Sequence, residues 1–165
     1  CTHRAQMNWQ PLELRPAPTP LTGIDDPQIA PLWEGAHRLA VDAGVDLCPP
    51  VLVPWTRKAH ELVAHAEAQD STTAHAVRLA IARCYALDGG DIGRVDVLME
   101  IAREHGLDRT ETKAVLDVDR YEAQVAAMGH QAAEANVTST PTIIAGDRRV
   151  EGFHNRTALS TLLGT

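Results

Sequence analysis

Three cysteines are the strongest nucleophiles in this chain, and they lie far apart in the sequence. Cys1, Cys48 and Cys84 form no Cys-x-x-Cys pair, the arrangement in which one thiol attacks a disulfide and a neighbouring thiol resolves it. Cys84 has helical spacing from Ile81, which favours a small buried side chain. Cys48 falls in a predicted loop. The sequence therefore predicts no self-contained dithiol site.

Two other motifs imitate catalytic signatures but do not satisfy them. His60 and His65 are five residues apart, whereas two imidazoles that bind zinc from one helix face need a spacing of about four. The glycine-rich run 88–93 lacks both a preceding strand and a following lysine, so it is not a phosphate-binding loop. We predict a turn there and no metal site in the chain.

The most informative stretch is residues 136–156. Thr140-Pro141 precedes a short β-branched run, Thr142–Ile144, and Gly146-Asp147 predicts a tight reversal into a second strand, Arg149–Glu151. A proline at the mouth of a strand is tolerated where the ladder does not need its N–H. Asn155 can cap a closing helix. We therefore predict a β-hairpin headed by a proline, followed by a helix.

This hairpin carries a family resemblance. Residues 137–152 resemble the cis-proline hairpin of the DsbA-like thioredoxin-fold family, which includes FrnE-type thiol oxidoreductases, 2-hydroxychromene-2-carboxylate isomerases and kappa-class glutathione transferases. Met7–Leu14 resembles the second strand of that family. Thr56–His60 and Tyr85–Ile92 resemble segments of its helical insertion.

The resemblance implies an α/β, thioredoxin-like fold with a large helical insertion, in which the N-terminal βα unit is missing. We expect one domain over residues 1–165, with residues 1–25 and 136–165 as the thioredoxin-like part and 26–135 as the insertion. In the family, the missing helix opens with Cys-x-x-Cys, or with serine in the glutathione-dependent branches. We therefore expect the catalytic residue upstream of residue 1.

The resemblance also implies the substrate-binding residues. Ser139, Thr140 and Pro141 would lie against the catalytic thiol and present backbone groups to the substrate. Trp55 and Thr56, together with His60, would line a substrate cavity.

No catalytic residue is assigned within the chain itself. Cys1 is the one candidate, and it is a poor one. Only seven residues separate Cys1 from Trp9, too few for a helix of about four turns.

Local patterns predict the remaining elements. Alternation predicts a strand from Ala5 to Gln10, and helical spacing predicts a helix from Pro31 to Gly44. A loop is expected over residues 46–55. Further helices are expected to begin at these capping residues: Thr56, Asp70 or Ser71, Asp91, Asp108 and Asp119.

Composition excludes several classes of function. A chain of 165 residues with 44% hydrophobic residues suits one globular domain, and its net charge of −7 disfavours nucleic-acid binding. We expect no nucleic-acid partner and no membrane association, since no signal peptide or transmembrane run is visible. Three scattered cysteines do not make a secreted disulfide framework, so we expect a cytoplasmic location.

Three functions remain open. The first is thiol–disulfide oxidoreduction of the DsbA or FrnE type, acting without a cofactor on a protein disulfide or small thiol. The second is a glutathione-dependent isomerase or transferase of the 2-hydroxychromene-2-carboxylate isomerase type, with glutathione as cofactor. The third is a non-catalytic module that binds peptides or thiols. The sequence leaves the oligomeric state undetermined.

Overall fold

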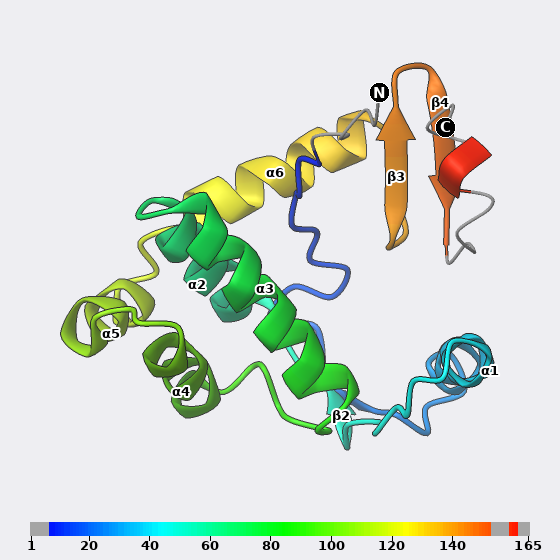
Figure 1. Cartoon of the computed structure of the whole chain (residues 1–165), viewed down its shortest axis with the longest axis horizontal. Coiled ribbons are helices and arrows are strands. Elements are labelled where there is room, and N and C mark those ends of the chain that lie inside the picture. The colour runs from blue at the N-terminus through cyan, green and yellow to red at the C-terminus, as the bar shows by residue number, and fades with distance from the viewer. Residues whose placement is uncertain (1–6, 153–158, 162–165) are drawn as a thin grey trace. The chain divides into compact units, whose positions relative to one another are not determined.

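The chain forms two compact units, which are described separately (Figure 1). The computed structural model describes residues 7–152 and 159–161. Unit 1 comprises residues 1–14 and 126–165, and unit 2 comprises residues 15–125. The predicted division into a thioredoxin-like part and an insertion at residues 26 and 135 stays a prediction.

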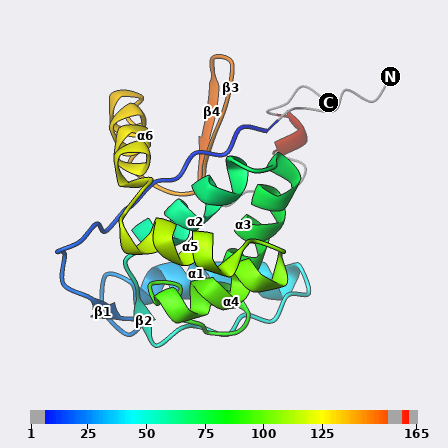
Figure 2. The same cartoon turned by 90° about the vertical axis from the view of Figure 1, so that its left-hand side faces the viewer.

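Unit 2 is mainly helical. Its elements in chain order are β1 (Thr22–Gly23), α1 (Ala30–Asp42), β2 (Leu52–Val53), α2 (Arg57–Glu67), α3 (Ser71–Ala86), α4 (Val95–Glu104) and α5 (Arg109–Asp117). The helix α2 packs against α3, α4 and α5 (Figure 2). Leu62, Val77, Leu98 and Leu116 are all fully buried in the core among these helices. Burying side chains of this size stabilises the fold by about 1.5–3 kcal/mol each.

Two of these helices begin with the side-chain caps that the sequence predicted. Asp70 accepts a hydrogen bond from the Thr73 amide at 2.7 Å, and Asp108 accepts one from the Glu111 amide at 2.8 Å. The cap predicted at Asp91 is wrong. Asp91 accepts from the Gly93 amide at 2.9 Å in a local turn, and α4 begins only at Val95.

The helix α1 also follows its sequence signals. It runs from Ala30 to Asp42, within two residues of the predicted ends, and Gly44 adopts a φ of +69° just beyond it. Trp33 of α1 contacts Tyr85 of α3, with ring centroids 5.8 Å apart. The predicted loop over residues 46–55 needs one correction, because Leu52–Val53 pairs with β1 as a short antiparallel ladder.

Unit 1 contains the predicted hairpin. Its strands are β3 (Thr142–Ala145) and β4 (Arg148–Glu151), which pair in antiparallel register with Ile143 opposite Val150. Gly146 takes a φ of +60° at the turn, a conformation that favours glycine. The helix α6 (Glu122–Glu134) begins in unit 2 and continues into unit 1. The capping box predicted from Asp119 to Glu122 is wrong, because the helix starts only at Glu122, Asp119 has a φ of +52° and its carboxylate binds Lys58 instead.

The strand predicted from Ala5 to Gln10 is wrong over its described part. Residues 7–10 form no strand, and Met7 and Trp9 are 67% and 50% exposed. Alternating polarity stabilises a strand only when a neighbouring strand accepts its backbone hydrogen bonds. Within the described residues, no strand pairs with this segment. Asn155, the predicted cap of the closing helix, lies outside the described residues, while residues 159–161 are helical.

A buried carboxylate joins α2 to the segment between α5 and α6. Glu61 is fully buried, and its Oε2 accepts a hydrogen bond from the Tyr121 amide at 3.1 Å. Lys58 Nζ lies 3.7 Å from the other Glu61 oxygen and 2.6 Å from Asp119 Oδ1, and it also donates to the Leu116 carbonyl. Burial raises the pKa of Glu61, opposed by the Tyr121 amide and the Lys58 charge.

This raised pKa predicts a pH-dependent effect of the Glu61→Gln substitution. A carboxyl whose pKa is higher in the folded than in the unfolded state stabilises the fold most below the unfolded pKa. That contribution is lost as the pH rises through the folded pKa. Glutamine keeps an acceptor for the Tyr121 amide but does not titrate. The free energy of unfolding of the variant, relative to wild type, should therefore rise from about pH 4 towards neutrality.

Urea denaturation across this pH range measures the effect. The matched control is Glu67→Gln on the same helix, where the side chain is exposed. Its difference from wild type should change little with pH. A Glu61→Gln variant that loses stability relative to wild type as the pH rises would contradict the raised pKa.

Candidate functional site

Residues 139–141 connect the segment after α6 to the first strand of the hairpin. The Thr140–Pro141 peptide bond is cis. On one side of it, the Thr142 hydroxyl donates a hydrogen bond to the Ser139 carbonyl at 2.7 Å. On the other side, the Gly152 amide donates to the Pro141 carbonyl at 2.8 Å. Both ends of this short segment are therefore tied to the hairpin.

Arg149 ties the hairpin to the end of α6. Its guanidinium donates to the Ala135 carbonyl at 2.8 Å and to the Asn136 carbonyl at 2.6 Å. The last carbonyls of a helix have no partner within the helix, and they lie at the negative end of its dipole. A guanidinium is well suited to this position because its donors form a rigid fork.

Glu151 continues the same network to the predicted site. One carboxylate oxygen lies 2.7 Å from an Arg149 nitrogen, and the other accepts a hydrogen bond from the Ser139 hydroxyl at 3.2 Å. The carbonyls at the end of α6, Arg149, Glu151 and Ser139 thus form one chain of polar contacts. We call these contacts the Arg149 network. The network fixes the segment that carries Thr140 and Pro141.

Thr140 itself is exposed and has no hydrogen-bond partner among the described residues. Its backbone N–H and C=O are therefore available to a ligand, next to the half-buried Pro141. Backbone groups presented in this way can pair with an extended peptide, as an additional strand pairs with a sheet edge.

Trp55 and Thr56 lie in unit 2, at the start of α2. Trp55 is 40% exposed, and its indole N–H donates to the Thr19 carbonyl at 2.8 Å. Thr56 precedes the helix, and its carbonyl accepts from the His60 amide at 3.0 Å. A Cβ at Gly93 would lie only 3.1 Å from the Trp55 carbonyl, so this glycine permits the close approach of the two segments.

His60 was the predicted companion of Trp55 and Thr56. Burial lowers the pKa of His60 to about 4, and the positive charge of Arg78 acts in the same direction. The imidazole is therefore neutral near neutral pH. It can donate or accept a hydrogen bond, but it supplies no positive charge to a thiolate.

The predicted site residues thus fall into two groups. Ser139, Thr140 and Pro141 are brought together in unit 1, and Trp55 and Thr56 are brought together in unit 2. A cavity that both groups line stays a prediction. The candidate nucleophile Cys1 lies outside the described residues.

The structure adds two residues that the sequence did not single out, Arg149 and Glu151. Their signal was present in the sequence. They lie two apart on a strand, so they share one face, and they carry opposite charges. The sequence could not show that the end of α6 lies beside them.

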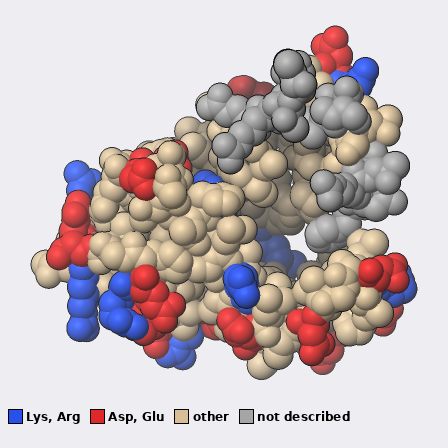
Figure 3. Space-filling view, in the orientation of Figure 1, with Lys and Arg blue, Asp and Glu red and all other residues tan. Residues whose placement is uncertain are grey.

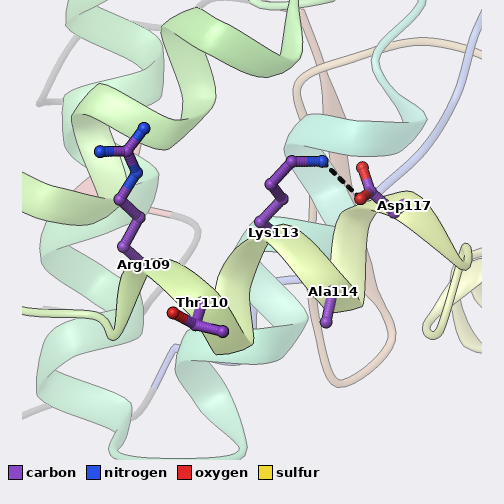
Figure 4. Close-up of a pocket in the computed structure, with 5 residues that line it drawn as sticks. All are labelled: Arg109, Thr110, Lys113, Ala114 and Asp117. Atoms are coloured by element: carbon purple, nitrogen blue, oxygen red, sulfur yellow. Dashed lines mark hydrogen bonds and ion pairs between the residues drawn. The ribbon is translucent and has the colours of Figure 1, made fainter.

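One other surface feature is a weaker candidate for a ligand-binding site. A shallow depression is lined by five residues of α5, namely Arg109, Thr110, Lys113, Ala114 and Asp117 (Figure 4). Lys113 pairs with Asp117 across one helical turn. No second element contributes to the lining, so the depression has no converging polar groups and we assign no ligand to it.

The described part of the chain shows no metal cluster and no membrane span. Within residues 7–152 and 159–161, no group of three or more His, Cys, Asp or Glu side chains could hold a metal ion. No helix in these ranges is long and apolar enough to cross a membrane. On the face that Figure 3 shows, Lys and Arg lie beside Asp and Glu.

Three comparisons relate the chain to known proteins. The model of the family described as "DSBA-like thioredoxin domain" matches residues 2–164. The "Uncharacterized protein YwbO" of Bacillus subtilis (strain 168) is 29% identical over 150 residues, which are 89% of this chain and 75% of YwbO.

A solved structure from Nitrosomonas europaea, described as a "putative protein disulfide isomerase", matches with a TM-score of 0.65. The sequence identity is 16%, and the match covers 84% of this chain and 73% of the other. At this identity, the likeness is one of fold.

The Arg149 network predicts the effect of Arg149→Met. Methionine keeps an unbranched apolar stem but removes the contacts to both carbonyls and to Glu151. The free energy of unfolding should fall by about 2 kcal/mol, since the lost hydrogen bonds involve a charged donor. Urea denaturation followed by circular dichroism measures the change.

The matched control is Arg148→Met, on the same strand. Arg148 is exposed, and its guanidinium donates to the Thr161 carbonyl at 3.1 Å. The control substitution should lower the free energy of unfolding by no more than about 1 kcal/mol, because exposed charged contacts usually contribute little to stability. Equal losses in the two variants would show that the Arg149 network has no special role.

Proposed function

Because the chain belongs to the family of DsbA-like thioredoxin domains, as its resemblance predicted, we propose that it serves in thiol–disulfide oxidoreduction. The predicted fold, an α/β thioredoxin-like domain with a helical insertion, is confirmed by the family match and by the structural likeness. The function proposed here is of the DsbA or FrnE type. Its substrate is a disulfide in a protein or a small thiol compound.

The observation that carries the proposal is the exposed, unbonded peptide group of Thr140 next to Pro141. Among the described residues, no hydrogen bond uses the Thr140 backbone, while its neighbours Ser139 and Thr142 are held in place. A peptide that carries a disulfide would pair with Thr140 in an extended conformation, and Pro141 would bound one side of the contact. Pre-fixed backbone groups reduce the entropy lost on binding.

The chemistry needs a thiolate. It attacks one sulfur of the substrate, the S–S bond breaks, and the second sulfur leaves as a thiolate that takes up a proton. A mixed disulfide then joins protein and substrate until a second thiolate resolves it. We propose that the attacking thiol precedes residue 1, because the chain has no Cys-x-x-Cys pair and its family places the catalytic residue in a helix upstream of the strand that Met7–Leu14 resembles.

Two further parts of the proposal concern the surroundings of the reaction. Trp55 and Thr56 would contribute an apolar and a polar group to the substrate cavity. We also propose a cytoplasmic location, because three cysteines at positions 1, 48 and 84 do not make the disulfide framework of a secreted protein.

Reduction of insulin by dithiothreitol tests the function. The assay uses this chain and a form that is extended upstream by the preceding coding sequence. The proposal expects acceleration by the extended form alone. Acceleration by neither form would contradict oxidoreduction and favour the non-catalytic binding module. Inactivity towards insulin together with glutathione-dependent isomerisation would favour the isomerase alternative instead.

The role of Thr140 predicts different effects for two substitutions at the same position. Thr140→Pro removes the backbone N–H, whereas Thr140→Ala keeps both backbone groups and removes only the side chain. Binding of a disulfide-containing peptide should weaken about tenfold in the proline variant, which corresponds to one lost hydrogen bond, and should change little in the alanine variant.

Isothermal titration calorimetry with an oxidised cystine peptide measures both affinities. Thermal unfolding shows whether the hairpin tolerates each change. If a folded Thr140→Pro variant bound the peptide as tightly as wild type, the proposed backbone pairing would be wrong.

A further inference from the structure

Two free cysteines of unit 2 lie against the same turn. Cys48 is in the segment after α1, and its amide donates a hydrogen bond to the Ala86 carbonyl at 2.9 Å, at the end of α3. Cys84 is in the last turn of α3, and its carbonyl accepts from the Gly90 amide at 2.8 Å. Backbone hydrogen bonds therefore tie each cysteine to the end of α3 or to the turn that follows it.

The glycines of this turn show where the sulfurs lie. A Cβ built on Gly89 would lie 3.2 Å from the Cys48 sulfur, and a Cβ built on Gly90 would lie 2.4 Å from the Cys84 sulfur. Consecutive Cα atoms are about 3.8 Å apart. Both thiols thus contact adjacent residues of one turn, although they belong to different segments of the chain.

The surroundings of the two thiols differ. Cys48 is exposed, and Cys84 is half-buried. Burial raises the pKa of the Cys84 thiol, and the nearby negative charge of Asp88 acts in the same direction. An external reagent therefore reaches Cys48 first, and Cys84 is placed to react second.

We propose that Cys48 and Cys84 form a redox-active dithiol, which a small disulfide such as oxidised glutathione converts to an intramolecular disulfide. Both cysteines belong to unit 2, and the proposal does not depend on the function proposed for the segment 139–141. The ligand class is a low-molecular-weight disulfide, which is also the oxidant of the reaction.

The reaction proceeds by two exchanges. The Cys48 thiol loses its proton to solvent, and its thiolate attacks one sulfur of oxidised glutathione. The S–S bond of glutathione breaks, and one glutathione leaves as a thiolate and is protonated. The Cys84 thiol then loses its proton to solvent, and its thiolate attacks the Cys48 sulfur. The S–S bond between Cys48 and glutathione breaks, and the second glutathione leaves as a thiolate and is protonated. Two cysteine thiols are oxidised, and one glutathione disulfide is reduced to two thiols.

The geometry requires only a local adjustment. A disulfide needs Cα atoms about 4.4–6.8 Å apart. The Cys48 backbone is already hydrogen-bonded to Ala86, two residues beyond Cys84. Forming the bond requires the exposed Cys48 segment to move towards α3, and neither Gly89 nor Gly90 carries a side chain that would occupy the space beside the two sulfurs. Once formed, the bond would join the segment after α1 to the end of α3.

Peptide mapping by mass spectrometry tests the proposal. The chain is prepared as Cys1→Ser, so that only two thiols remain, and is treated with oxidised glutathione. It is then quenched in acid, alkylated and digested under non-reducing conditions. The expected result is a linked peptide pair that contains Cys48 and Cys84, with loss of both free thiols together.

Two variants in the same Cys1→Ser background separate the steps. Cys84→Ser should accumulate a stable glutathione adduct on Cys48, because the resolving thiol is absent. Cys48→Ser should leave Cys84 mostly unmodified over the same time. The proposal is overturned if the Cys1→Ser chain yields separate glutathione adducts, or two free thiols, with no linked peptide pair. This result comes from the chain with both thiols present and needs neither variant to fold.

Discussion

The guanidinium of Arg149 is the contact on which the candidate site depends. It binds two carbonyls at the end of α6 and one oxygen of Glu151, whose other oxygen receives the Ser139 hydroxyl. A single planar cation therefore connects a helix end, a strand and the segment before Pro141, and it leaves the Thr140 backbone open to a ligand.

Unit 2 also contains a cation that contacts carboxylates and a backbone carbonyl. There the cation is Lys58, which contacts the buried Glu61, Asp119 and a carbonyl in the last turn of α5. Removing a carboxylate from water is costly, and a nearby ammonium and a backbone amide offset part of that cost. In both units, a charged side chain thus fixes a non-helical segment against a helix. Such a scaffold allows loops to present reactive or binding groups with little loss of order.

Sequence signals predicted those features that local chemistry controls. Asp70 and Asp108 cap their helices because an aspartate before a helix can reach the free amides within it. The hairpin was predictable because a β-branched run, a glycine turn and a second strand lie in the right order, and Gly146 has the expected positive φ. The choice of Ser139 and Thr140 depended on the family resemblance, since no local rule marks an exposed backbone group.

The predictions that were wrong or missed have a common physical cause. In each case, the local structure depends on a partner that is distant in sequence. Residues 7–10 alternate in polarity but find no strand to pair with among the described residues. Asp91 closes a local turn because it bonds to Gly93, four residues before the helix end that it was expected to cap. The role of Arg149 could not be predicted, because only the folded chain places the end of α6 beside it. Cys48 and Cys84 appeared unrelated for the same reason.

Amide chemical-shift mapping by NMR tests the central claim most directly. An oxidised, cystine-containing peptide is titrated into the isotope-labelled chain, and the shift of each backbone amide is followed. The account predicts that the largest changes fall on Ser139, Thr140 and the adjoining residue Thr142. Changes that concentrate on α5 around Arg109–Asp117, with residues 139–142 unaffected, would contradict it.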